Sequence, residues 1–186
     1  ASLVGSEMCI RDSTWSTSTT NTTNLNTNYL TYLDSKNTKW KNMIADATWY
    51  VGGMTKANGY KSNAKTAYTY EVGANKDVTT VTSKIGLMYL SEYYYGATPD
   101  YWMLQGFRYD NATNDNWLYT GLYEWTISRD SDASDGAFAV RAGGDLIINP
   151  VDYSDGAAVR PSFSLSPSIK FTSGEGTAVN PIRIKL

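Results

Sequence analysis

Alternation of apolar and polar residues is clearest between residues 156 and 165. Every second residue near the end of this stretch is apolar, namely Val159, Pro161, Phe163 and Leu165. A period of two is typical of a strand with one buried face. Because proline cannot donate a hydrogen bond to a neighbouring strand, we expect this strand to lie at a sheet edge or to carry a bulge at Pro161.

Two upstream segments, residues 123–128 and 137–140, have the same β-prone character. Both are short, and Gly and Asp clusters of the kind found in hairpin turns separate them. We predict that they join residues 156–165 in a small antiparallel sheet. The large apolar side chains of the three strands are then expected to share one buried cluster, formed by Trp125, Phe138, Val159 and Phe163.

Helical spacing appears in the first quarter of the chain. Apolar residues recur three and four positions apart, at Tyr29, Leu30 and Leu33 and again at Trp40, Met43, Ile44 and Ala47. This spacing predicts a short helix before Asp34 and a second helix over residues 38–47. The preceding run of Thr, Ser and Asn, residues 14–28, has the composition of a linker or surface turn.

The middle of the chain contains further strand patterns. Residues 48–51 and 66–72 read as strands joined by a polar connection. Residues 81–90 include a short apolar run followed at once by Ser91 and Glu92, which predicts a buried strand feeding a short helix. At the end of the chain, residues 182–186 alternate again and predict a closing strand.

Composition limits the class of protein. The chain has 186 residues, of which 41% are hydrophobic and 18% charged, which favours one globular domain of α+β type. With a formal net charge of −2, we expect no nucleic-acid partner. Apolar runs are too short to span a membrane. Histidine is absent and Cys9 is the single cysteine, which removes the commonest zinc ligands and general base.

The N-terminal segment has a separate origin on our interpretation. Residues 2–13, with Met-Cys-Ile-Arg-Asp at positions 8–12, resemble one reading frame of a transposase-based sequencing adapter. We therefore exclude residues 1–13 from the domain and expect them to make little contact with it. The native part is then residues 14–186 of a metagenomic reading frame, truncated at its N-terminus and free of cysteine. A genuine N-terminal strand is the alternative.

Short motifs from residue 15 to residue 181 carry a family resemblance. The most distinctive are Val-Arg-Pro at 159–161 and the Ser-Gly-x-Gly-Thr-x-x-Asn-Pro pattern of residues 173–181. Others are Trp-Ser-Thr-Ser at 15–18 and Glu-Trp-Thr-Ile-Ser at 124–128. In this order they resemble an uncharacterised family of surface domains from Gram-positive gut bacteria. That family is similar in turn to the C-type-lectin-like fold shared with formylglycine-generating enzymes.

This resemblance implies an α+β, C-type-lectin-like domain. In that fold, two N-terminal helices pack on a small irregular antiparallel sheet with long loops. It also implies an extracellular or cell-surface location on a Gram-positive bacterium. The oxidation chemistry of formylglycine-generating enzymes requires cysteines, which the native part of this chain lacks, so that activity is not expected. The resemblance brings no cofactor.

Acidic residues raise the question of calcium. Asp130, Asp132 and Asp135 lie close together in a polar stretch. However, the sixth position of an EF-hand loop counted from Asp130 is Asp135 in place of Gly, and the twelfth is Arg141 in place of Glu. We interpret this stretch as a solvated hairpin turn. A calcium site in the loops that carry Asp145, Asp152 and Asp155 is kept as an alternative.

One spacing matches a catalytic signature. Ser62 and Lys65 fit the Ser-x-x-Lys pattern of serine acyl-enzymes, but the Lys-Thr-Gly and Ser-Asp-Asn partners of that signature are missing. We interpret the match as a chance spacing. Pairs of carboxylates for glycoside hydrolysis are available in the chain, yet their separation in space, which defines that mechanism, is not given by sequence.

Aromatic residues are the remaining functional signal, with 15 Tyr and 6 Trp. Trp residues inside helix or strand patterns are expected in the core, namely Trp40, Trp49, Trp117 and Trp125. Aromatic residues near Pro99, followed by the polar run 109–116, are expected instead to form a ligand surface without a metal or a catalytic group. The predicted ligand-binding residues are Tyr94, Tyr95, Tyr101, Trp102, Asn111 and Asn114.

These patterns favour a noncatalytic binding or adhesion module, which recognises a glycan or a surface protein through aromatic-rich loops. The second hypothesis is a structural subunit or domain of a surface appendage, which mainly packs against its neighbours. An enzyme is the third.

Overall fold

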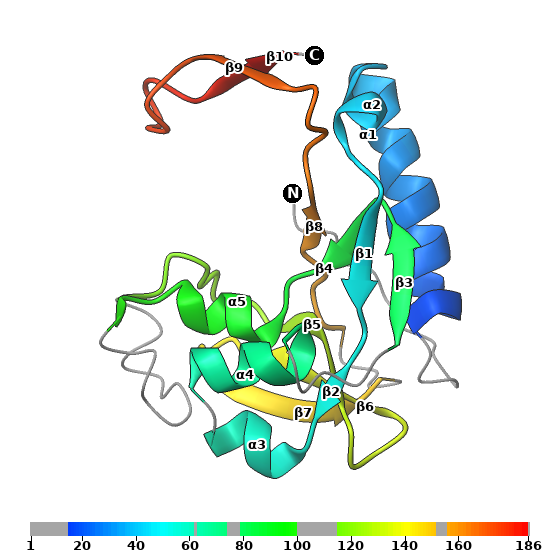
Figure 1. Ribbon diagram of the computed structural model, residues 1–186, viewed down its shortest axis with the longest axis vertical. Coiled ribbons are helices and arrows are strands. Elements are labelled where there is room, and N and C mark those ends of the chain that lie inside the picture. Colours follow the sequence, from blue (N-terminus) through cyan, green and yellow to red (C-terminus); the bar gives the residue numbers. More distant parts are fainter. Residues whose placement is uncertain (1–14, 62, 74–78, 100–114, 152–155, 186) are drawn as a thin grey trace.

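The computed structural model describes residues 15–61, 63–73, 79–99, 115–151 and 156–185 (Figure 1). It is a mixed α+β structure, in which a 17-residue N-terminal helix and several small helices accompany small, mostly antiparallel sheets. The predicted α+β class is therefore confirmed. The prediction that residues 2–13 make little contact with the domain concerns a segment outside the described residues.

The N-terminal helix covers residues 20–36. A 3₁₀ turn at Trp15–Thr17 (η1) precedes a π-helical part, Thr20–Tyr29 (η2), which continues into an α-helical part, Leu30–Lys36 (α1). The prediction of a linker or surface turn over residues 14–28 is thus wrong for most of that stretch. Helix formation there depends on tertiary contacts as well as on local propensity.

Asn26 shows how a polar sequence holds this helix in place. Its side-chain amide donates to the carbonyl oxygen of Ile85 (2.9 Å), while its amide oxygen accepts from the N–H of Ile85 (2.9 Å). The side chain therefore pairs with a strand as another backbone segment would. It also donates to Asn21 in the preceding turn. Asparagine usually disfavours helices, but in this protein the side chain of Asn26 joins the helix to Ile85 in the sheet region.

The second predicted helix is much shorter than expected. Only Trp40–Met43 (α2) is helical, and Ala47 already belongs to strand β1, Ala47–Tyr50. Strand β1 confirms the strand predicted over residues 48–51. It pairs antiparallel with β3, Thr80–Ser83.

The largest sheet has four strands in the order β2-β5-β6-β7. Strand β2 (Gly53–Met54) runs parallel to β5 (Glu124–Asp130), while β6 (Gly136–Val140) is antiparallel to both β5 and β7 (Leu146–Pro150). The hairpin predicted from residues 123–128 and 137–140 is confirmed by β5 and β6. The acidic stretch from Asp130 to Asp135 forms the end of β5 and the turn of that hairpin.

Both faces of this sheet are buried, and each contacts a different core. Trp125, Ile127, Ala137 and Ala139 pack in a first cluster with the N-terminal helix, β1 and β4 (Ile85–Leu87). Phe138 and Val140 lie in a second cluster with residues of the short helices. Because neighbouring residues of a strand point to opposite faces, Phe138 cannot share a cluster with Trp125, whose partner across the sheet is Ala139. The predicted single cluster is therefore wrong.

Strand 156–165 also differs from the prediction. Only Pro161–Phe163 (β8) is a strand, and it pairs with β4. Among the described residues, the predicted pairing with residues 123–128 is limited to a single bridge between Ala158 and Glu124. Phe163 was expected in the core but is 38% exposed, whereas Val159 packs against the first cluster. Pro161 is the first residue of a strand in a two-stranded sheet, a position that needs few ladder donors.

The remaining short helices cover the second core. They are α3 (Lys56–Lys61), α4 (Ala64–Glu71) and α5 (Leu90–Tyr95). The strand predicted for residues 66–72 is wrong, because Ala64, Ala67 and Glu71 are buried at helical spacing. Asn63 accepts a hydrogen bond from the N–H of Thr66 (2.9 Å) and caps α4. The predicted change from strand to helix over residues 81–90 is confirmed by β4 and α5.

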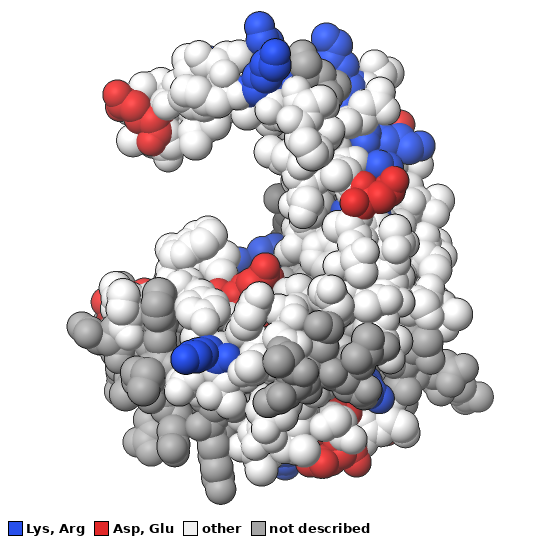
Figure 2. All heavy atoms as spheres, viewed as in Figure 1, with Lys and Arg blue, Asp and Glu red and all other residues white. Residues whose placement is uncertain are grey.

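A C-terminal hairpin extends away from the rest of the structure. Strands β9 (Lys170–Ser173) and β10 (Arg183–Lys185) pair with each other, and Figure 1 shows them far from the four-stranded sheet. The closing strand predicted at residues 182–186 is thus confirmed as β10, within a separate sheet. Figure 2 shows the surface hollowed between this hairpin and the rest of the molecule.

Glu71 links three elements inside the second core. At the C-terminal end of α4, its carboxylate accepts hydrogen bonds from the N–H groups of Leu90 (3.0 Å) and Ser91 (3.1 Å), at the start of α5. It also accepts from the hydroxyl of Ser128 in β5. Burial raises the pKa of Glu71 to about 7, although these hydrogen bonds act in the opposite direction.

We predict that the Asn26 side chain contributes strongly to stability. Asn26→Asp should lower the free energy of unfolding by about 1–3 kcal/mol, since a carboxylate can accept from Ile85 but cannot donate to it. Chemical denaturation measures the change. Asn28→Asp, at an exposed position of the same helix, is the matched control and should change stability by less than about 0.5 kcal/mol. Equal losses in both variants would contradict the role of Asn26.

A second prediction concerns pH. The pKa of Glu71 is raised from 4.5 to about 7 on folding, so the folded state binds this proton more tightly than the unfolded state does. Glu71 therefore stabilises the fold most below pH 4.5, and that contribution declines as the pH rises through 7. The stability difference between wild type and Glu71→Gln should shift by roughly 3 kcal/mol across this window.

Denaturation of both proteins at several pH values tests the second prediction. Other titrating groups are common to the two proteins and cancel in the difference. Glu175→Gln, at an exposed site in the C-terminal hairpin, is the control and should follow wild type at every pH. A difference between wild type and Glu71→Gln that does not change with pH would contradict the prediction.

Candidate functional site

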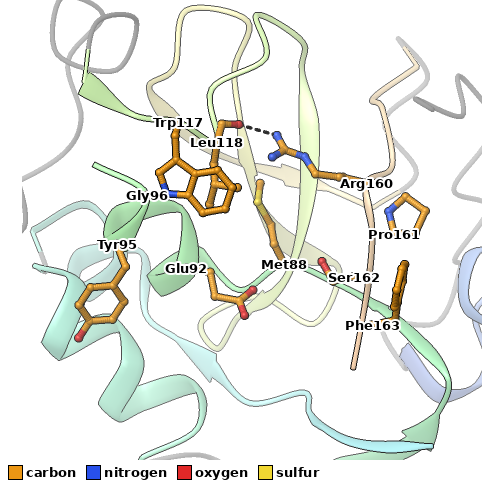
Figure 3. A pocket seen from close by; sticks show the side chains of 10 residues that line it. All are labelled: Met88, Glu92, Tyr95, Gly96, Trp117, Leu118, Arg160, Pro161, Ser162 and Phe163. Carbon is orange, nitrogen blue, oxygen red and sulfur yellow. Dashed lines mark hydrogen bonds between the residues drawn. The ribbon is translucent and has the colours of Figure 1, made fainter. Parts of the chain in front are cut away.

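A pocket of about 540 Å³ lies between helix α5, the turn at residues 116–118 and strand β8. This volume falls within the range of small-molecule sites, roughly 300–1,000 Å³. We call it the Trp117 pocket. Most of its lining is apolar, and Figure 3 shows its side chains around one open space. The lining residues are Met88, Glu92, Tyr95, Gly96, Trp117, Leu118, Arg160, Pro161, Ser162 and Phe163.

Trp117 is the most exposed aromatic residue of the pocket, with 80% of its surface open to solvent. Its backbone is nevertheless held firmly. The N–H of Trp117 donates to the carbonyl of Gly96 (3.1 Å), and the buried side chain of Asn116 donates to the carbonyl of Tyr93 (2.7 Å). The amide oxygen of Asn116 in turn accepts from the N–H of Leu118 (2.9 Å). The turn therefore presents the indole from a fixed backbone.

Gly96 permits this close approach of the turn to α5. A β-carbon at position 96 would clash with the side-chain oxygen of Asn116 and lie 3.0 Å from the side chain of Leu118. A larger residue would therefore displace the turn that carries Trp117. Glycine is required at position 96 for lack of space and not for its backbone conformation, because the backbone of Gly96 is in the ordinary right-handed helical region.

Arg160 forms the opposite wall of the pocket through a partly buried ion pair. Its guanidinium contacts both carboxylate oxygens of Glu124, the first residue of β5, whose side chain is almost fully buried. The same guanidinium donates to the carbonyl of Leu118 (2.7 Å). Figure 3 shows this bond across the upper side of the pocket. Arg160 thus joins β5, the turn of Trp117 and the segment leading to β8.

Glu92 is the acidic group of the pocket lining. One carboxylate oxygen accepts from the N–H of Tyr89 (2.8 Å), as in the capping box of a helix start. The side chain is open to solvent through the pocket, yet surrounding protein atoms desolvate it and raise the pKa of its carboxyl. Figure 3 shows the carboxylate between Trp117 and strand β8.

The structure separates the predicted ligand-binding residues. Tyr95 is exposed and borders the Trp117 pocket. Tyr94 lies in the second core instead of on the surface, and its hydroxyl donates to the carbonyl of Gly59 (3.1 Å). The other predicted residues, Tyr101, Trp102, Asn111 and Asn114, lie outside the described residues.

Trp117 is a correction to the sequence analysis. It was expected in the core with three other tryptophans, but only Trp49 and Trp125 are buried, and Trp40 is 39% exposed. Trp117 follows a polar run and precedes Gly121, so the sequence did contain a turn signal near it. Arg160 and Glu124 lie 36 positions apart, and no local sequence pattern indicates that they form an ion pair.

The residues considered for a calcium site and for an acyl-enzyme lie partly outside the described residues. In that part of the chain, no three His, Cys, Asp or Glu side chains are grouped so that they could hold a metal ion. Asp145 forms an ion pair with Arg141 (3.0 Å), while Asp152 and Asp155 lie outside the described residues. Lys65 is exposed on α4, and Ser62 is also outside the described part.

Among the described helices, none is long and apolar enough to cross a membrane. Comparison of the chain with protein-family models, with curated proteins and with solved structures finds no match in any of the three.

Proposed function

We propose that this protein is a noncatalytic binding module that recognises a glycan through the Trp117 pocket. The observation that carries the proposal is the 80% exposure of Trp117 on a turn held by several hydrogen bonds. A large apolar ring on a mobile segment would lose conformational entropy on binding a ligand, whereas this backbone is already ordered.

The other pocket residues are compatible with a sugar ligand. Tyr95 and Phe163 add exposed aromatic rings on either side, while Ser162 and Glu92 supply polar groups. Pyranose rings have an apolar CH face and a rim of hydroxyl groups, so they need an aromatic platform with hydrogen-bonding groups beside it. An apolar pocket with few polar groups provides that combination.

We also propose a C-type-lectin-like fold and a location at the surface of a Gram-positive cell. The support for both is the family resemblance of the motifs in the sequence. A long N-terminal helix, small irregular sheets and extended connections are compatible with such a domain. A site built on loops and a turn at the end of a scaffold is also common among binding domains.

The test is a glycan array with wild type, Trp117→Ala and Trp40→Ala. Trp117→Ala should abolish binding and leave the melting temperature nearly unchanged, because the exposed side chain contributes little to packing. Trp40→Ala removes another exposed tryptophan outside the pocket and should bind as wild type does. Binding should also survive EDTA. Unchanged binding by Trp117→Ala would place the ligand elsewhere, and loss of binding in EDTA would contradict a metal-free site.

A structural role in a surface appendage is the second candidate function, and the C-terminal hairpin favours it. An isolated two-stranded hairpin is marginally stable in water, and this one exposes Phe171, Val179 and Ile182. Lys170, Arg183 and Lys185 against Glu175 give it a formal charge of +2, so the other residues of the chain carry −4 of the total of −2. The charges favour docking of the hairpin on the body of a second copy, in a head-to-tail arrangement.

Sedimentation velocity tests this second candidate. Wild type should self-associate at low ionic strength and dissociate at high ionic strength, where charges are screened. Phe171→Ser should weaken the association, and Tyr68→Ser, which removes an exposed aromatic residue of α4, should not. A monomer at every concentration and salt level would contradict a structural role through the hairpin.

A further inference from the structure

The Trp117 pocket contains two charged side chains in its described lining, and their charges are not equally available. The guanidinium of Arg160 already contacts the carboxylate of Glu124 and the carbonyl of Leu118. The nearly buried carboxylate of Glu124 already compensates the positive charge of Arg160, so a ligand anion would compete with that carboxylate. Arg160 is therefore a structural element of the wall, and an acidic sugar such as a uronate gains little from it.

The carboxylate of Glu92, in contrast, is available to a ligand. One of its carboxylate oxygens accepts from Tyr89, and among the described residues no Lys or Arg lies within ion-pair distance of it. Its carboxylate faces the pocket between Trp117 and β8 (Figure 3). Among the described lining residues, Arg160 is paired with Glu124, so the negative charge of Glu92 is left without a compensating partner charge in that part of the chain.

We propose that the ligand of the Trp117 pocket carries an ammonium group and is a glycan with unacetylated 2-amino sugars. This inference rests on the proposed function and deepens it. The carboxylate of Glu92 pairs with the ammonium, and the exposed indole of Trp117 stacks on the sugar and attracts the cation through its π face. An N-acetyl group at the same place is neutral, so it can neither pair with the charge of Glu92 nor be attracted as a cation to the indole of Trp117.

The protein atoms around the Glu92 carboxylate support this preference, although the side chain is open to solvent. Protein atoms around the carboxylate raise its pKa because they disfavour its charge. A bound cation replaces part of the interaction that water otherwise provides to the carboxylate. The neutral hydroxyl groups of a sugar interact more weakly with the carboxylate of Glu92 than an ammonium group does.

The experiment compares a glucosamine pentamer with the N-acetylglucosamine pentamer of the same linkage. Isothermal titration calorimetry is performed with wild type, Glu92→Gln and Trp117→Ala, at a pH at which the sugar amine is protonated. Wild type should bind the amino form about tenfold more tightly than the acetylated form, the size expected of one charge-assisted hydrogen bond. Glu92→Gln should lose that preference while still binding the acetylated form. Trp117→Ala should lose both.

Glu92→Gln is a conservative variant for this purpose, because the amide oxygen can still accept from the N–H of Tyr89. Glu175→Gln makes the same chemical change at an exposed site of the hairpin and should retain the preference of wild type. The comparison of the two sugars on wild type alone also tests the proposal if Glu92→Gln is unstable.

The outcomes separate this inference from the proposed function. Equal binding of both pentamers, or tighter binding of the acetylated form, overturns the ammonium preference and leaves glycan binding in place. A preference that survives in Glu92→Gln overturns the assignment of Glu92. Absence of binding to either pentamer overturns the inference, while the glycan array still decides whether other sugars bind.

Discussion

The hydrogen bonds of Glu71 are the interaction on which the packing of the short helices depends. A buried carboxylate is costly unless donors surround it, and here the donors come from two other elements, the start of α5 and strand β5. Helix α5 has only six residues and would not be stable alone. Because its first N–H groups bind Glu71, its position is set by α4 and β5. The Trp117 turn is joined to the other end of α5, so the geometry of the pocket is set partly by this buried contact.

Strand β5 contains further buried polar side chains that are held by partners from other elements. Its residues alternate between two buried faces: Trp125 and Ile127 lie in the first core, while Glu124, Thr126 and Ser128 form a buried polar row. Each member of that row has a partner, namely Arg160, the carbonyl of Phe138 and Glu71. The row connects the wall of the pocket to the contact of α4 with α5. A substitution in β5 should therefore affect both stability and the shape of the pocket.

Sequence patterns predicted those elements whose periodicity agreed with their environment. The β5–β6 hairpin, β1, β10 and the change from β4 to α5 all followed from alternation, short apolar runs and turn residues. The prediction of a single cluster was wrong because a polar row such as Glu124, Thr126 and Ser128 is typical of a solvated face, whereas both faces of β5 are buried here. The apolar residues of segment 66–72 fit both the two-residue period of a strand and the three-to-four-residue spacing of a helix. The segment is a helix, and that conformation buries Glu71 together with Ala64 and Ala67. The short helix predicted before Asp34 is confirmed by α1, but the part of the same helix over residues 20–28 was missed, because Asn26 there is held by Ile85, which is 59 positions away.

The candidate site was harder to predict than the fold, for a related reason. Crowding of Tyr and Trp drew attention to a region of which Tyr95 borders the pocket. Burial divides neighbours there, because Tyr94 is in the core and Tyr95 is on the surface. Trp117 and Phe163, both expected to be buried, are instead exposed around the pocket. Their exposure follows from tertiary constraints, because Asn116 ties one turn to α5 and the β4–β8 pairing sets the position of Phe163. The pocket is thus shaped by contacts between segments far apart in the sequence, and these contacts leave Trp117 and Phe163 exposed around it.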